Sequence, residues 1–160
     1  MNKILTIQQG VEVAQKIKRQ NKTIVMTGGF FDILHLGHIK FLEKAKKCGD
    51  YLFVLLEEDI KALEKGKDRP INSQKNRAKI LSSLKNVDYI IMLRNMTNDQ
   101  IYDKIMVEMR PNTIATTRDD PYVERKTRQA NLIQGKVVCV TKRIDDHSTT
   151  KYAKLINSKI

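Results

Sequence analysis

The chain has 160 residues, of which 41% are hydrophobic and 30% charged, and its formal net charge at pH 7 is +12. This length and apolar content suit one folded domain, which we expect over residues 1–160. No stretch approaches the roughly 18 apolar residues of a membrane span, and the N-terminus has no signal-peptide pattern. Cys48 and Cys139 lack the spacing of a metal or redox motif. We therefore expect a cytoplasmic protein with free thiols, no protein-bound metal and no membrane contact.

The positive charge raises the question of a nucleic-acid partner, because Lys and Arg attract polyanions. The 30 basic residues are spread along the chain among 18 acidic ones, without the interleaved aromatic residues of a single-strand binding surface. Such charges belong mostly on solvated helix faces. We therefore expect no nucleic-acid partner.

Hydrophobic periodicity alternates between helix and strand along the chain. In order, it predicts helix 7–20, strand 23–27, helix 38–48, strand 51–56, helix 73–86, strand 89–93, helix 98–109, strand 113–116, helix 122–134, strand 137–141 and helix 148–156. Strands that alternate with helices of this length form parallel βαβ units. We predict a Rossmann-like, doubly wound α/β fold with a mostly parallel five-stranded sheet, helices on both faces, and ligands at the carboxyl ends of the strands.

The strand at 23–27 runs into Gly28 and Gly29, and His35 and His38 follow at the start of the next helix. Glycine lets the backbone approach a ligand closely, and the first N–H groups of a helix bind anions. Histidine donates hydrogen bonds to charge that develops on a phosphoryl group. Each feature alone is commonly a turn or a cap, but together they predict a phosphate site.

Residues 64–69 are charged and contain a glycine, so we expect a flexible segment there. Lys65 is suited to swing onto a triphosphate, because its charge is compact and its donors rotate; a solvated loop is the alternative. In the next helix, Arg77 shares the apolar face of Leu81 and Leu84 and needs an anion or carboxylate partner inside. We predict a phosphate contact for Arg77, with a snorkelling structural arginine as the alternative.

Ser148, Thr149 and Thr150 stand at the start of the last predicted helix. They form a capping sequence, and a capped helix start also presents hydroxyls, N–H groups and the positive end of the dipole to phosphates. Lys151 adds charge one turn further on. The role of His147 stays open.

Seven residues of the glycine and histidine segment spell T-x-G-x-F-D-x-x-H-x-G-H, and this pattern resembles the signature of the cytidylyltransferase-like nucleotidyltransferases. The resemblance implies that both histidines contact the nucleotide phosphates and stabilise the transition state. The catalytic candidates are His35, His38 and Lys65. The nucleotide-binding candidates are Thr27, Gly28, Gly29, Phe30, Phe31, Asp32, Gly37, Arg77, Asp119, Ser148, Thr149 and Thr150. For Asp32, a structural role in the turn is the alternative.

The segment Lys65-Gly66-x-x-Arg69-Pro70-Ile71-Asn72, with Arg77, resembles the bacterial heptose-1-phosphate adenylyltransferases, and residues 148–150 resemble a motif that closes nucleotidyltransferases of this kind. The implied reaction condenses ATP with heptose 1-phosphate and releases pyrophosphate, with Mg²⁺ bridging the phosphates, in a homodimer. A glycerol-3-phosphate cytidylyltransferase is the alternative.

One segment departs from both enzyme types. Thr117-Arg118-Asp119-Asp120 stands where the adenylyltransferases carry Gly-Gly-Asp and the cytidylyltransferases Gly-Asp-Asp. Loss of that glycine would fit a nucleotide-binding module without turnover, whereas the intact histidines argue for an enzyme.

Overall fold

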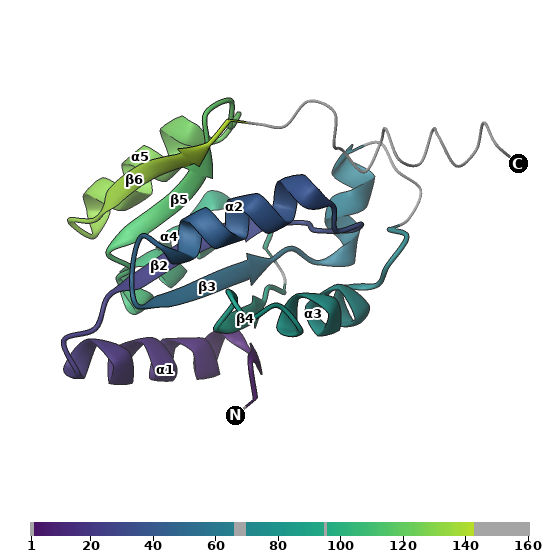
Figure 1. Ribbon diagram of the computed structural model, residues 1–160. Coiled ribbons are helices and arrows are strands. Elements are labelled where there is room, and N and C mark those ends of the chain that lie inside the picture. Colours follow the sequence, from purple (N-terminus) through teal and green to yellow (C-terminus); the bar gives the residue numbers. More distant parts are fainter. Residues whose placement is uncertain (1, 66–69, 95, 143–160) are drawn as a thin grey trace, which may run out of the picture.

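The computed structural model describes residues 2–65, 70–94 and 96–142, without the side chains of 63–65. Its centre is a parallel sheet with the strand order β1-β4-β3-β2-β5-β6 (Figure 1). The strands are β1 (Ile4–Leu5), β2 (Ile24–Gly29), β3 (Tyr51–Leu56), β4 (Tyr89–Met92), β5 (Thr113–Thr117) and β6 (Lys136–Thr141). Every neighbouring pair is parallel, as the alternation of strands and helices predicted.

The prediction of five strands was wrong, because β1 makes the sheet six-stranded. Its two residues are too few to carry an alternating pattern. Pairing with β4 alone defines this strand: Ile4 lies opposite Ile90, and the N–H of Ile90 donates to the carbonyl of Lys3 at 2.8 Å.

The helices are α1 (Ile7–Arg19), α2 (Leu36–Lys46), α3 (Gln74–Ser82), α4 (Asp99–Met109) and α5 (Val123–Leu132), with a 3₁₀ helix, η1 (Asp59–Lys65), after β3. Ser73 caps α3, as predicted, by accepting from the N–H of Asn76. The helix predicted at 148–156 lies outside the described residues. Within the part of the chain that the structure describes, no helix is long and apolar enough to cross a membrane.

Two apolar clusters pack on opposite faces of the sheet, because successive strand residues point to opposite sides. In β2, Ile24 and Met26 belong to the cluster that includes residues of α1 and α4, whereas Val25 belongs to the one that includes residues of α2 and α3. Helices thus cover both faces, as predicted (Figure 1).

The chain reverses its direction of winding at β2. From there it proceeds through β3 to β4 on one side, and β5 and β6 lie on the other. In open parallel sheets, ligands bind outside the carboxyl ends of the strands at such a switch point. Gly28 and Gly29, the last residues of β2, occupy this position.

Candidate active site

The turn after β2 needs glycine at Gly29. A Cβ atom there would lie 2.6 Å from Cε2 of Phe31, well inside van der Waals contact. Phe31 itself has φ 51°, in the left-handed region, which costs a non-glycine residue on the order of 1 kcal/mol. Gly28 is exposed and has only ordinary contacts, 3.8 Å to Leu55, around the position of a Cβ. The turn therefore packs tightly on one side and leaves its backbone accessible on the other.

The two histidines lie together at the start of α2. His35 is the N-cap residue of α2 and makes no side-chain capping hydrogen bond. Its side chain therefore does not occupy the N–H groups of the first helical turn. The rings of His35 and His38 are stacked, with centroids 3.8 Å apart. The ring of Phe31 contacts that of His38 at 5.1 Å. The strained turn thus packs directly against the second histidine.

His38 is uncharged at neutral pH. Burial lowers its pKa to about 4, and repulsion from His35 acts in the same direction. A hydrogen bond with the backbone of Ile33 raises the pKa but does not offset these two causes. Its Nδ1 atom is buried and has no hydrogen-bond partner among the described residues. A neutral imidazole at a helix N-terminus can donate to a phosphate oxygen, and negative charge brought there would favour its protonation.

Three predicted nucleotide-binding side chains lie beneath the turn instead of on its surface. Thr27, Phe30 and Phe31 are 1%, 8% and 6% exposed. The hydroxyl of Thr27 donates to the carbonyl of Ala115 at 3.2 Å and so ties β2 to β5. These side chains shape the turn, while Gly28 and the signature glycines Gly29 and Gly37 are at least partly accessible.

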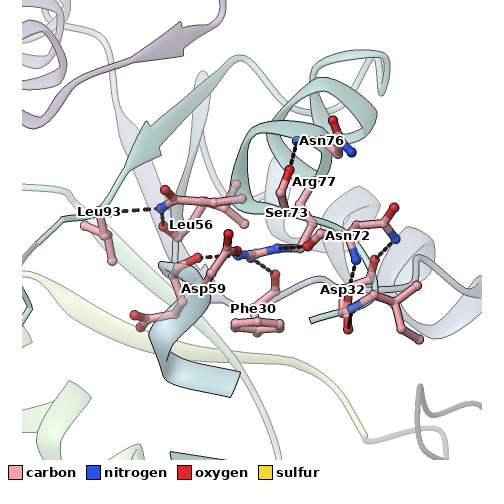
Figure 2. Close-up of polar contacts among 12 residues, drawn as sticks. Phe30, Asp32, Leu56, Asp59, Asn72, Ser73, Asn76, Arg77 and Leu93 are labelled. Carbon is pink, nitrogen blue, oxygen red and sulfur yellow. Dashed lines mark hydrogen bonds and ion pairs between the residues drawn. The ribbon is translucent and has the colours of Figure 1, made fainter. Parts of the chain in front are cut away.

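Arg77 also differs from its predicted role. It is 0% exposed, and Nη2 lies 2.7 Å from a carboxylate oxygen of Asp59. The need for a carboxylate or anion partner was therefore predicted correctly, and the partner is a carboxylate of the protein. Burial among protein acceptors favours a structural role over a phosphate contact, but the guanidinium is enclosed and does not snorkel as the alternative expected (Figure 2).

Comparison with known proteins identifies the family. The family model named Cytidylyltransferase-like matches residues 26–155. The chain belongs to this family.

Relatives of this chain include proteins named Bifunctional protein HldE. That of Nitratiruptor sp. is 37% identical over 78% of this chain and 28% of its own length, and that of Campylobacter curvus is 35% identical over 97% and 31%. The chain therefore spans about a third of the length of these relatives.

Two solved structures share the fold of this chain. The lipopolysaccharide core biosynthesis protein of Thermoplasma volcanium superposes with a TM-score of 0.62 at 32% identity, over 76% of this chain and 96% of its own. Pantoate-beta-alanine ligase of Francisella tularensis has a TM-score of 0.63 at 17% identity, over 86% of this chain and 66% of its own, which shows likeness of fold alone.

The segment after β5, where this chain departs from both enzyme types, holds a half-buried ion pair. Asp119 is exposed, whereas Asp120 accepts hydrogen bonds from Lys126 and Thr116. Burial acts to raise the pKa of Asp120, but the bonds from Lys126, Thr116 and the N–H of Tyr122 outweigh it and hold the pKa below its usual range. Sequence analysis missed this pair, because Lys126 lies a helical turn into α5 and nothing in the sequence indicates its direction.

A second missed contact lies after β3. The hydroxyl of Tyr102, on α4, hydrogen-bonds to both carboxylate oxygens of Glu57, at 2.8 and 3.0 Å. The side chain of Lys65 and residues 147–150, with their predicted phosphate contacts, lie outside the described residues.

Proposed function

We propose that this nucleotidyltransferase transfers an adenylyl group from ATP to a sugar 1-phosphate, with heptose 1-phosphate as acceptor. An oxygen of the acceptor phosphate attacks the α-phosphorus in line. The bond from that phosphorus to the β-phosphate oxygen breaks, and pyrophosphate leaves. The attacking oxygen is already anionic, so the step needs no general base and no covalent intermediate.

The stacked histidine pair at the switch point carries this proposal. Charge builds up on the oxygens around the α-phosphorus as the reaction proceeds, and fixed donors that meet it lower the barrier. In this proposal His35 and His38 are such donors, at the first turn of α2. His38 is neutral before the nucleotide binds. It can therefore take up a proton when the negatively charged phosphates bind beside it.

The remaining phosphate contacts stay predictions. In this proposal Lys65 approaches the β- and γ-phosphates, and Ser148, Thr149 and Thr150 bind them through hydroxyl and N–H groups. Asp119 is exposed at the carboxyl end of β5, beside β2, and is assigned to the nucleotide. The homodimer and the cytoplasmic location also stay predictions.

Magnesium is assigned to the nucleotide and not to the protein. In the described ranges, no group of three His, Cys, Asp or Glu side chains is placed to hold a metal ion. Asp32, the acid within the turn, already accepts hydrogen bonds from two backbone N–H groups. Mg²⁺ bound to the triphosphate would neutralise charge there, and the roles given to the two histidines do not depend on it.

Adenine and heptose are the finer part of the proposal. They are supported by the Arg69-Pro70-Ile71-Asn72 segment, which resembles the adenylyltransferases, and by the relatives named HldE. The competing reaction uses CTP and glycerol 3-phosphate, and hydrogen bonds to a base edge can separate two such nucleotides by several orders of magnitude.

The test is a pyrophosphate-release assay that combines each of four NTPs with heptose 1-phosphate and with glycerol 3-phosphate. We expect ATP with heptose 1-phosphate to be fastest, and His38→Asn to lower that turnover on the order of 10²-fold with the melting temperature nearly unchanged. A preference for CTP with glycerol 3-phosphate would overturn the adenylyl assignment. Nucleotide binding without pyrophosphate from any pair would favour the module without turnover.

A further inference from the structure

Each of the three guanidinium nitrogens of Arg77 donates to an acceptor of the protein. Nε donates to the carbonyl of Asn72 at 3.0 Å, and Nη1 donates to the carbonyl of Phe30. Nη2 donates to the carbonyl of Glu57 at 2.9 Å and to Asp59 at 2.7 Å. The guanidinium carbon lies 4.0 Å from the centre of the Phe30 ring, within cation–π range. Figure 2 shows Phe30, Asp59 and Asn72 around the end of the side chain.

The acceptors come from three segments that meet at the carboxyl ends of the central strands β2 and β3. Phe30 directly follows β2, Glu57 and Asp59 follow β3, and Asn72 precedes α3. Arg77 itself lies in the first turn of α3. One side chain therefore joins the glycine turn to the chain that leaves β3 and to the start of α3.

Asp32 ties the same turn a second time. Its carboxylate accepts from the N–H of Ile71 at 3.0 Å and of Asn72 at 2.8 Å, and the Asn72 side chain donates back to the carbonyl of Asp32 at 2.9 Å (Figure 2). Phe30 and Asp32 are thus both anchored, and Phe31 lies between them. A backbone in a disfavoured conformation persists only where its surroundings over-determine it. These two anchors hold Phe31 at φ 51°, with its ring against His38.

Two simpler roles for Arg77 account for less. To bind a phosphate, Arg77 would have to release some of its protein acceptors in a buried site. A buried charge that loses its partner costs several kcal/mol. For stability alone, a well-packed apolar side chain often serves as well as a buried ion pair. Neither role explains why the contacts of Arg77 and Asp32 converge on the residues that flank Phe31.

We propose that Arg77 and Asp32 are positioning residues, which fix the strained Phe31 and through it the orientation of His38. The inference rests on the proposed nucleotidyltransferase function, in which His38 meets the transition state. Displacement of a reacting group by about 1 Å can cost on the order of 10²-fold in rate. The two residues thus act on turnover without touching the substrate.

Kinetics of Arg77→Lys and Asp32→Asn test this role. Lysine keeps the charge but not the fork of donors, and asparagine places an amide against one of two backbone N–H groups. We expect kcat to fall roughly 10- to 100-fold in both variants, while the Kd for nucleotide changes less than about threefold. The control is Ser73→Ala, which weakens the cap of the same helix but leaves these contacts in place, and it should keep the kcat of the unaltered chain.

A second readout does not depend on turnover. The chain has only three histidines, so their ring protons can be assigned by NMR and titrated. Release of the turn should expose His38 and raise its pKa from about 4 towards 6.5 in Arg77→Lys and Asp32→Asn, but not in Ser73→Ala. If the arginine variant fails to fold, Asp32→Asn decides.

The outcomes separate this inference from the proposed function. A nucleotide Kd raised tenfold or more with little change in kcat would make Arg77 a phosphate ligand and overturn the inference. An unchanged kcat and an unchanged His38 titration in folded variants would reduce both residues to structural ones. If the unaltered chain released no pyrophosphate, the proposed function alone would be wrong. The His38 titration would still show whether Arg77 and Asp32 position that residue.

Discussion

At the scale of single residues, burial gives His38 its chemistry. The unfolded chain has a histidine with a pKa near 6.5, whereas the folded chain holds it near 4. Between these two values the unfolded state binds a proton that the folded state does not. The contribution of this group to stability is therefore complete above pH 6.5 and is lost as the pH falls towards 4.

This sign leads to a prediction for stability. Between pH 6.5 and 4, the free energy of unfolding of the unaltered chain should fall by roughly 2 kcal/mol more than that of His38→Asn. Each unit of pKa shift is worth about 1.4 kcal/mol, and the partial exposure of His38 reduces the effect. Urea denaturation at pH 7.5, 5.5 and 4.5 measures the difference. His35→Asn should retain most of it, because burial is the larger cause. Parallel curves for the unaltered chain and His38→Asn would show that His38 titrates normally.

At the scale of elements, the end of β2 separates packing from ligand access. Gly29 faces the ring of Phe31, and Gly28 faces no crowded neighbour. Alanine at these two adjacent positions therefore tests the two properties separately.

We expect Gly29→Ala to lower the free energy of unfolding by about 2 kcal/mol, since its Cβ has to displace a packed ring. Gly28→Ala should leave the melting temperature nearly unchanged but raise the KM for nucleotide severalfold, because its methyl group lies where the phosphates approach the backbone. Thermal melts and initial rates on both variants measure this. If Gly28→Ala kept the KM of the unaltered chain, the nucleotide would not approach the turn on this side.

At the scale of the whole molecule, a net charge of +12 acts on anionic substrates before they reach the site. Salt screens this attraction, since the Debye length falls from about 10 Å at 0.1 M to about 3 Å at 1 M. We expect kcat/KM for the nucleotide to fall severalfold between about 0.05 and 0.5 M NaCl, mainly through KM, with kcat changed less than about twofold. A neutral osmolyte at matched osmolality serves as the control. A flat salt profile would confine the relevant attraction to the site itself.

The alternation of strands and helices, and the place of the glycine and histidine motif, followed from the sequence alone. Both depend on local properties, namely hydrophobic period and the spacing of residues a few positions apart. The strand β1 and the partners of Arg77 did not follow, because each depends on chain segments that are far apart in sequence. Ile4 pairs with Ile90, and Arg77 reaches Phe30, 47 residues away.

What the sequence determined by itself is therefore the family, the parallel α/β fold and the position of the two histidines at the start of a helix. The tertiary structure decided which charged residues face the protein. The guanidinium of Arg77 suits a phosphate site in sequence, but in the fold its donors meet Asp59 and the backbone carbonyls of neighbouring segments. The carboxylate of Asp32 likewise accepts from the backbone N–H of Asn72, 40 residues away. A buried polar group needs a hydrogen-bond partner, and the folded chain determines which group is close enough to serve. The residue type alone does not determine that partner.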